Sequence, residues 1–576
     1  MESFPTTDRS GLAPSLDEDP ALGLSHRAKM EILFAVMLGL FLGALDQTIV
    51  GPALPTIATD LAGNDLYVWA ITIYLLTSTI SVPFWGKLSD LYGRKPMFMI
   101  GIVIFLVGSA LSGLSQNMGM LILFRGIQGI GAGSLFPVAL AVIGDLFTPA
   151  ERGKYQGLFG AVFGVAFVVG PLVGGWLTEQ VSWHWIFYVN IPIGLIALFV
   201  ISRLLPTMKT ERATRNFDIL GGAIFTVAIS FLLVGLTNKQ FGDWADPTVG
   251  GFILAGLIGT VLFILAEARA KEPIIPLQLF RNRTYTSSMI STFFASFAFF
   301  GAIIFLPRWF QFVHGFSPTN SGLAALPLMV GLIFSSIVSG LIVARTGRYK
   351  WLLVGAIVVM AISTALMTQL TATTDLAIVW LWMFIAGLGV GPTFSVFTIV
   401  VQNAVPFSQL GVATSNLTFF RQIGGSVALA IVGTIFGSTF LEQIGPQLGT
   451  AGVPAQVVAG FGQATSSGAL DFNKLTGVGD LGAAILAATP EAFRAGIQPF
   501  IPQIVTGIHQ AFSLAVAQTF WIGVAAAIVS AVAAAFMIEH PLRAGAPVTA
   551  PAAAPAPGKA APDAQPSLGA TSSPAD

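Results

Sequence analysis

The sequence predicts an all-α membrane protein of fourteen transmembrane helices, built as two six-helix bundles with two further helices between them. Three observations lead to this prediction. Of the 576 residues, 54% are hydrophobic and 9% are charged, whereas soluble domains carry about 25% charged residues. Apolar segments of about 20 residues, enough to cross the hydrocarbon core, recur along the chain. Short motifs of the first half also return in the second half.

Each expected crossing is an apolar segment that ends in a polar or glycine-rich turn. In chain order we expect them at 32–57, 66–86, 96–115, 119–146, 150–178, 183–204, 217–238, 247–268, 285–312, 319–344, 351–371, 376–402, 409–440 and 507–538. The corresponding domains are a cytoplasmic tail (1–29), an N-terminal bundle (30–205), a two-helix linker (206–272), a C-terminal bundle with an extracellular loop at 441–506 (273–540) and a disordered Ala/Pro-rich cytoplasmic tail (541–576).

The positive charges predict the orientation. With both termini in the cytoplasm, most of the 27 Lys and Arg residues lie on the inner side, as the positive-inside rule requires. Residues 1–25 are polar and acidic, which argues against a cleaved signal peptide, so we expect the first helix to be retained. The remaining Lys and Arg residues are outside (Lys239, Arg308, Lys474 and Arg494) or within helices (Arg125 and Arg421).

The composition excludes several kinds of chemistry. There is no cysteine, so neither a disulfide framework nor a thiolate site is available. The five histidines are scattered among the tail, loops and a helix start, with no HExxH motif. We therefore expect no metal, no cofactor and no enzymatic activity, although a membrane-embedded enzyme is the distant alternative. A formal charge of zero gives no indication of a nucleic-acid partner, and we expect a monomer.

An internal repeat links the two halves. GKLSDLYGRK from Gly86 is echoed by GLIVARTGRY from Gly340, so that Gly93 corresponds to Gly347. The glycines of FRGIQGIGAG in the fourth expected helix are echoed by those of FIAGLGVG in the twelfth, at nearly the same offset. The second copy has lost its charges, because Ala344 replaces Asp90. Duplicated halves of this kind place a substrate site between them near the membrane midplane.

Asp46 is the acid that we place deepest in the membrane. A charged side chain at the centre of a helix costs about 2.5–3.5 kcal/mol on insertion scales, so such residues are usually functional. Arg125 lies at a similar depth, within ~8 Å along the membrane normal at 1.5 Å per residue. The alternative is that a neighbouring helix satisfies Asp46 without any role in transport.

GKLSDLYGRKP, residues 86–96, combines two turn glycines, Gly86 and Gly93, with charged residues at helix ends. We expect Asp90, Arg94 and Lys95 to form a charged cluster, with Asp145 as a partner for Arg94. This motif resembles the cytoplasmic signature of the major facilitator superfamily. The resemblance implies a gate that stabilises the outward-facing state, while the alternative is a basic loop that only sets topology.

Other segments carry a closer resemblance. VVGPLVGGW resembles the antiporter signature of that superfamily and LFRGIQGIGAG its arginine motif, which implies proton coupling at Arg125. With ALDQTIVGPALPTI, SWHWIFYVNIPIG, FFRQIGGSVALA and the fourteen spans, the chain resembles the fourteen-helix drug:proton antiporter family. Pro171 and the neighbouring glycines are suited to a bend or a close helix contact. The residues of this antiporter motif are Gly170, Pro171, Gly174 and Gly175.

Aromatic residues gather in the second half. If these aromatic side chains line a cavity, that cavity would accept lipophilic molecules. An aromatic helix is also typical of packed cores and of lipid-facing surfaces. Two roles stay open for Arg421, beside Gln422: it pairs with an anionic group of the substrate, or it holds its helix through backbone carbonyls. Members of the family that export divalent cations often carry extra carboxylates in the tenth helix. Segment 321–344 contains none, which argues against divalent cations as the substrate. The candidate lining residues are Phe297, Phe300, Phe394 and Phe420.

These observations favour a proton-coupled antiporter that exports amphiphilic compounds such as drugs, dyes and antibiotics by alternating access across a bacterial cell membrane. A proton and a lipophilic cation are expected to compete for Asp46. The alternative is an exporter of a lipid, glycolipid or siderophore with the same fold. The loop at 441–506 contains an amphipathic stretch, DLGAAILAATPEAFRAGIQPFI, that covers the outer vestibule or contacts lipid headgroups.

Overall fold

The structure is a computed structural model that describes residues 24–62, 66–206, 217–239, 242–466, 481–489, 494 and 496–539. The described residues form helices and connecting turns, without a strand among them. Most of the expected cytoplasmic tails, and part of the expected extracellular loop, lie outside the described residues. The expected all-α fold is therefore confirmed for the described residues.

The first group of helices precedes residues 207–216, which lie outside the described part of the chain. Several begin at a side-chain cap: Ser25 accepts the amide hydrogen of Ala28, and Thr148 forms a capping box with Glu151. Gly93 joins two helices with a φ of 96°, which a residue with a Cβ rarely adopts. The helices are α1 (His26–Asp60), α2 (Tyr67–Tyr92), α3 (Arg94–Gly113), α4 (Met118–Leu146), α5 (Pro149–Gln180), α6 (Trp185–Tyr188) and α7 (Asn190–Leu204).

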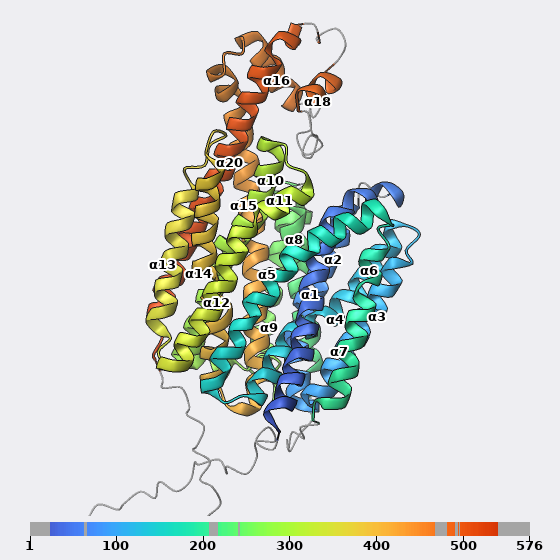
Figure 1. The fold of residues 1–576 in the computed structure, drawn as a ribbon, viewed down its shortest axis with the longest axis vertical. Coiled ribbons are helices and arrows are strands. Elements are labelled where there is room, and N and C mark those ends of the chain that lie inside the picture. The colour runs from blue at the N-terminus through green and yellow to red at the C-terminus, as the bar shows by residue number, and fades with distance from the viewer. Residues whose placement is uncertain are drawn as a thin grey trace, which may run out of the picture.

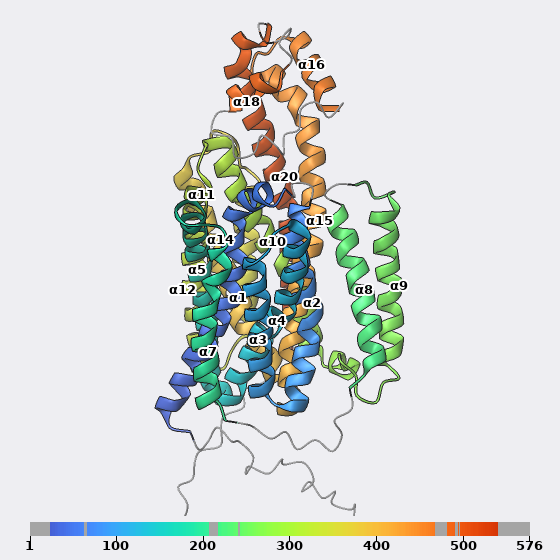
Figure 2. The same ribbon diagram turned by 90° about the vertical axis from the view of Figure 1, so that its right-hand side faces the viewer.

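Two helices and the π-helix η2 follow, and they stand beside the bundle (Figure 2). Phe225 of α8 lies 5.9 Å from Phe84 of α2 and 5.2 Å from Phe419 of α15, measured between ring centroids. The inserted pair therefore contacts a helix from each half. The elements are α8 (Ile219–Asn238), η2 (Pro247–Gly251) and α9 (Phe252–Glu267).

The last group repeats the long helices of the first, and Gly347 joins α12 to α13 with a φ of 67°, as Gly93 joins α2 to α3. Its elements are η3 (Leu277–Arg281), α10 (Arg283–His314), α11 (Pro318–Ala324), α12 (Leu326–Thr346), α13 (Lys350–Met367), α14 (Leu376–Asn403), η4 (Phe407–Gln409), α15 (Leu410–Thr450), α16 (Ala455–Ser466), α18 (Leu481–Ala488), η5 (Gln498–Phe500) and α20 (Ile501–Ala535).

The repeat of the glycine motifs is visible in the packing. A Cβ on Gly131 of α4 would lie 2.3 Å from the Phe105 backbone nitrogen of α3, and one on Gly389 of α14 would lie 2.5 Å from the Met360 nitrogen of α13. Real Cβ atoms do not approach so closely, so both sites require glycine. The two glycine motifs thus make equivalent helix contacts in the two halves.

Thirteen of the described helices are long and apolar enough to cross a membrane, one fewer than expected. The remaining expected crossing, 66–86, lies in α2, whose 26 residues exceed the length that a crossing requires. The fourteen-helix arrangement, the domain boundaries and the cytoplasmic placement of both termini stay predictions.

The segment expected to be an extracellular loop is largely helical where it is described. α15 has 41 residues, about 60 Å of helix against a hydrocarbon core of about 30 Å, and it projects with α16, α18 and α20 beyond the other helices (Figure 1). Leu448 and Ile504 are fully buried there. Apolar packing between the ends of α15 and α20 explains why both helices continue past their expected boundaries, 440 and 507.

The charge distribution predicts the orientation, and the cysteine-free sequence allows a direct test. We expect a cysteine at exposed Gln456 of α16 to react with a membrane-impermeant maleimide in intact cells. A cysteine at exposed Arg348, after α12, is expected to react only after permeabilisation. The parent protein supplies the blank, and the opposite labelling pattern would reverse the assigned orientation.

Candidate functional site

A buried polar network surrounds Asp46 in the first half. Arg125 of α4 donates from Nη1 to Asp46 Oδ2 at 2.6 Å. Gln128 and Asn190 donate to Asp46 Oδ1 at 2.8 and 2.9 Å. The carboxylate therefore receives donors from α4 and α7 while it sits on α1. Asp46 and Arg125 were expected at similar depths, and the structure brings them into direct contact.

Arg125 is held on several sides besides Asp46. Its Nη1 donates to Gln128 Oε1 at 2.9 Å, and its Nε donates to the Ala70 carbonyl at 3.3 Å. The ring of Tyr74 lies 4.0 Å from the guanidinium carbon, within the range of a cation–π contact. Arg125 thus crosses from α4 to both α1 and α2.

Gln128 and Asn190 were not among the expected site residues. Gln128 follows Arg125 by three positions, which places both on one helix face, so the arginine motif itself contained the signal. Asn190 lies at the start of α7 and also donates to Ser109 Oγ of α3 at 3.1 Å. The sequence contained a signal for it, because Asn190 lies within SWHWIFYVNIPIG, one of the segments that carry the family resemblance.

This network is closed to solvent. Asp46 is 0% and Arg125 2% exposed, so a ligand reaches the carboxylate only after the pair opens. Removing one partner of a buried ion pair typically costs about 3–5 kcal/mol, because the other charge stays buried without compensation. A proton added to Asp46 has a related effect, since it removes the negative charge that faces Arg125.

The antiporter motif lies beside Asp46 and also reaches the other half. An added Cβ on Gly174 of α5 would lie 2.3 Å from the Ile49 carbonyl oxygen of α1, so these backbones touch. Pro171 faces α11, where its Cβ is 3.3 Å from the Cβ position of Gly322. Two further motif residues divide in the same way, with Gly170 against Thr48 of α1 and Gly175 against Thr319 of α11.

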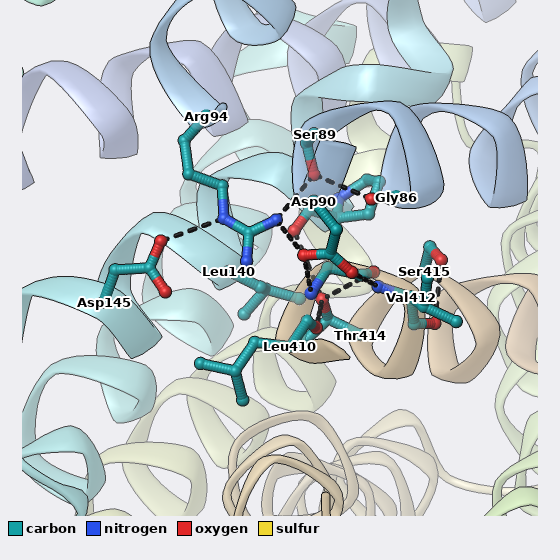
Figure 3. A network of polar contacts seen from close by, with 12 residues as sticks. Gly86, Ser89, Asp90, Arg94, Leu140, Asp145, Leu410, Val412, Thr414 and Ser415 are labelled. Carbon is teal, nitrogen blue, oxygen red and sulfur yellow. Dashed lines mark hydrogen bonds and ion pairs between the residues drawn. The ribbon is translucent and has the colours of Figure 1, made fainter. Parts of the chain in front are cut away.

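Asp90 connects the two halves near the C-terminal end of α2, and Figure 3 shows it between Arg94 and Val412. Its Oδ1 accepts the backbone N–H of Gly411 at 3.0 Å and its Oδ2 that of Val412 at 2.9 Å. These donors belong to the first turn of α15, where N–H groups lack partners within the helix and the helix dipole favours a negative charge. A carboxylate of the first half thus caps a helix of the second.

Arg94 holds Asp90 in this position. It forms an ion pair with Asp90, donates from Nε to Asp145 Oδ2 at 2.9 Å and donates from Nη1 to Ser89 Oγ at 2.8 Å. The expected pairing of Arg94 with Asp145 is therefore present in the structure. Lys95 stands outside this set: the ion pairs among the described residues do not include it.

Glycines bring the backbones together at this closure. A Cβ on Gly86 of α2 would lie 2.1 Å from Ser415 Oγ of α15. On the opposite side of the bundle, a Cβ on Gly340 of α12 would lie 2.1 Å from the Gly153 carbonyl oxygen of α5. The two contacts are equivalent under the repeat, but the second lacks a counterpart of Asp90.

Further hydrogen bonds join the halves near this end. Gln156 of α5 donates to Gln402 Oε1 of α14 at 2.7 Å, and Gln402 in turn donates to the Leu140 carbonyl of α4 at 3.0 Å. Ser336 donates to the Gly157 carbonyl at 3.1 Å. These buried side chains were not expected from the sequence, because their partners lie far away in the chain.

Lys87 belongs to the same motif but points to the inserted helices. It is 3% exposed, and its Nζ lies 2.9 Å from Glu272 Oε2, in the segment that follows α9. Glu267, also buried, accepts the backbone N–H of Ile274 at 3.0 Å. The motif at 86–96 therefore contacts the second half through Asp90 and the insert through Lys87.

Arg421 lies in the second half, on α15, and is half-buried. Its Nη2 donates to the Thr393 carbonyl at 3.1 Å and its guanidinium carbon lies 4.3 Å from the centre of the Phe394 ring. Phe163 of α5 packs 5.4 Å from Phe394 across the boundary between the halves, and Phe299 of α10 packs 5.6 Å from it. Phe394 thus links this cation to an aromatic cluster with rings from both halves.

The other expected lining residues divide between two places. Phe300 contacts the Cβ position of Gly425, one turn above Arg421, so it joins the cluster. Phe297 packs in a separate apolar group with Ala428 and Ala526, and Phe420 faces Phe280 at 6.1 Å. Gln422 adjoins Arg421 in sequence, and its buried Oε1 has no hydrogen-bond partner among the described residues.

Metal-binding groups of three or more His, Asp or Glu side chains were not found in the part of the chain that the structure describes. What the described residues offer are two separate charged centres at depth, Asp46–Arg125 and Arg421, and a closure between the halves at one end. Such an arrangement allows a proton, a ligand and a conformational change to act on different residues.

Comparisons with known proteins assign the family. Residues 36–429 match the Major Facilitator Superfamily. Multidrug transporter protein MdtP of Bacillus subtilis is 40% identical over 431 residues, which are 74% of this chain and 79% of that protein. Multidrug resistance protein 3 of Bacillus subtilis is 33% identical over 512 residues, 88% and 94% of the two chains. Efflux pump dotC of Dothistroma septosporum is 34% identical over 455 residues, 77% of each.

Solved structures share the fold. The human organic anion transporter MFSD10 has a TM-score of 0.53 at 17% identity, over 71% of this chain and 94% of that one. The proton:xylose symporter XylE has a TM-score of 0.53 at 14% identity, over 72% and 90%. The chain therefore belongs to the Major Facilitator Superfamily, as a multi-pass membrane transporter, not an enzyme, that is related to multidrug efflux pumps.

Proposed function

We propose that this chain is a fourteen-helix drug:proton antiporter that exports amphiphilic compounds across the cell membrane by alternating access, with the proton gradient as its energy source. The observation that carries the proposal is the fully buried Asp46–Arg125 pair, 2.6 Å apart. The multidrug transporters to which the chain is similar support export of drug-like molecules.

Protonation of Asp46 supplies the coupling. The neutral carboxyl group no longer balances Arg125, whose remaining partners are Gln128, the Ala70 carbonyl and the Tyr74 ring. A buried guanidinium without a counter-ion is unfavourable, so the protonated state favours any arrangement that gives Arg125 water or another acceptor. The proton thereby shifts the balance between two conformations.

The closure at Asp90 indicates which conformation this is. With both termini in the cytoplasm, Asp90, Gly411 and Val412 lie at the cytoplasmic end, and they join the two halves there. The structure then corresponds to an outward-facing state. Opening to the cytoplasm breaks both bonds from Asp90 to α15 and exposes the first turn of that helix.

For the coupling residue, we expect Asp46→Asn to abolish proton-driven efflux. It also lowers the melting temperature, because Arg125 loses its counter-ion. The double variant Asp46→Asn with Arg125→Gln replaces a charged pair by two amides, so it is expected to recover much of the melting temperature but no efflux. Dye efflux and substrate-driven pH change are measured in proteoliposomes that carry an imposed pH gradient.

The double variant is the matched control here, since it separates folding from coupling. Full proton-driven efflux by Asp46→Asn would exclude Asp46 as the coupling group. Recovery of efflux in the double variant would show that the pair is only structural.

For the closure, we expect Asp90→Ala to slow transport while substrate affinity in detergent stays nearly unchanged. An N-cap is worth about 0.5–2 kcal/mol, so its loss shifts the equilibrium towards the inward-facing state by about twofold to thirtyfold. Asp90→Asn, which keeps one acceptor oxygen, is expected to have a smaller effect in the same direction. The shift is measured as faster alkylation of a cysteine at Ser415, which is fully buried against Gly86.

Asp375→Ala provides the comparison. Asp375 caps α14 through the Ala377 N–H at 2.8 Å, within one helix and one half, so its loss leaves Ser415 protected. A loss of substrate affinity in Asp90→Ala as large as the loss of transport rate would place Asp90 in the binding site and contradict the gating role.

A further inference from the structure

Arg421 is a cation at depth that the proposed coupling mechanism does not use. It follows the start of α15 by about 17 Å of helix at 1.5 Å per residue, far from the closed end at Gly411. Asp46, Asp90 and Asp145 are engaged by other arginines. Among the ion pairs of the described residues, none contains Arg421.

The donors of Arg421 are only partly used. A guanidinium has five N–H donors in a fixed fork that matches the two oxygens of a carboxylate. The described residues accept one hydrogen bond from it, from Nη2 to the Thr393 carbonyl. Arg421 remains half-buried despite its depth, so solvent or a ligand has access to the rest of the fork.

The surroundings of Arg421 are apolar and aromatic. Phe394 lies against the guanidinium, Phe163 packs on the Phe394 ring from the other half, and Phe300 packs on Gly425, one helical turn after Arg421. Gly301, the residue after Phe300, is buried, yet nothing lies within 4 Å of its Cβ position. Flat rings beside a cation that lacks an ion pair among the described residues suit a planar apolar molecule with an acidic group.

We propose that Arg421 binds the carboxylate of an acidic amphiphilic substrate, whose planar body lies among Phe163, Phe394 and Phe300. The inference rests on the transport proposed above and names the substrate class for it. The substrate anion supplies the counter-charge that the described residues do not offer to Arg421. The proton site at Asp46 and the substrate site at Arg421 are then distinct and lie in different halves.

Two dyes that differ only in the acidic group test this inference. Rhodamine B carries a free carboxylate, and its ethyl ester does not. We expect the purified protein in detergent to bind rhodamine B about tenfold more tightly than the ester, as charge-assisted hydrogen bonds in a partly desolvated site imply. Binding is followed by fluorescence anisotropy, after subtraction of the signal from empty micelles.

Variants assign the preference to one residue. Arg421→Gln is expected to weaken rhodamine B binding about tenfold and to leave the ester unchanged, while Arg421→Lys keeps part of the preference. Arg283→Gln is the matched control, because Arg283 also stacks on a phenylalanine, Phe536 at 5.4 Å, but is exposed. It should leave the affinity for both dyes unchanged.

Equal affinity of the unmodified protein for the two dyes would overturn the inference, and this comparison holds even if Arg421→Gln does not fold. Equal weakening of both dyes in Arg421→Gln would overturn it as well and would make Arg421 a structural support of α15. The measurement uses no pH gradient. A failure of proton coupling would therefore appear in the proteoliposome assay and leave the dye preference intact.

Discussion

The ion pair between Asp46 and Arg125 is the constraint on which the organisation of the first half depends. A carboxylate and a guanidinium in a membrane bundle are acceptable only when they meet and when their other polar atoms are satisfied. Gln128 and Asn190 donate hydrogen bonds to the second carboxylate oxygen, and the Tyr74 ring covers the guanidinium. Helices α1, α2, α4 and α7 are thereby fixed around one point, and a proton at that point affects all four.

The closure between the halves is asymmetric, although the helices that form it are repeated. Gly86 on α2 and Gly340 on α12 make the same close backbone contact with the opposite half. Only the α2 side adds a charge, Asp90, to the helix end that it touches. The glycine contacts allow the two backbones to approach closely but involve no charge. The cap that Asp90 makes on α15 is instead lost completely when the two halves separate at this end. The charged side is therefore suited to set the energy difference between states.

The sequence was sufficient for the helical fold and for those site residues whose partners could be inferred from depth. Asp46 and Arg125 met as expected because helix rise alone fixes depth to within the reach of an arginine. The links to Asn190, Gln402 and the N–H groups of Gly411 and Val412 depend on which helices become neighbours, and local pattern does not contain this information. The long extensions of α15 and α20 escaped prediction for the same reason, since each is stabilised by the other.

Contacts of α5 connect the two charged centres, Asp46–Arg125 and Arg421. Thr48, two residues after Asp46, donates to the Ala166 carbonyl of α5 at 3.0 Å, and the backbone at Ile49 touches Gly174. About two turns from Gly170 on α5 lies Phe163, which packs on Phe394, the ring that covers Arg421. In the mechanism that we propose, a shift of α1 on protonation of Asp46 would act on α5 directly, because no side chain separates the two backbones at Gly174. A displaced α5 would carry Phe163 with it and so change the packing on Phe394, the ring that lies against Arg421. Glycines on one face of α5 and phenylalanines on another thus allow a single rigid helix to relate a proton in the first half to a ligand in the second.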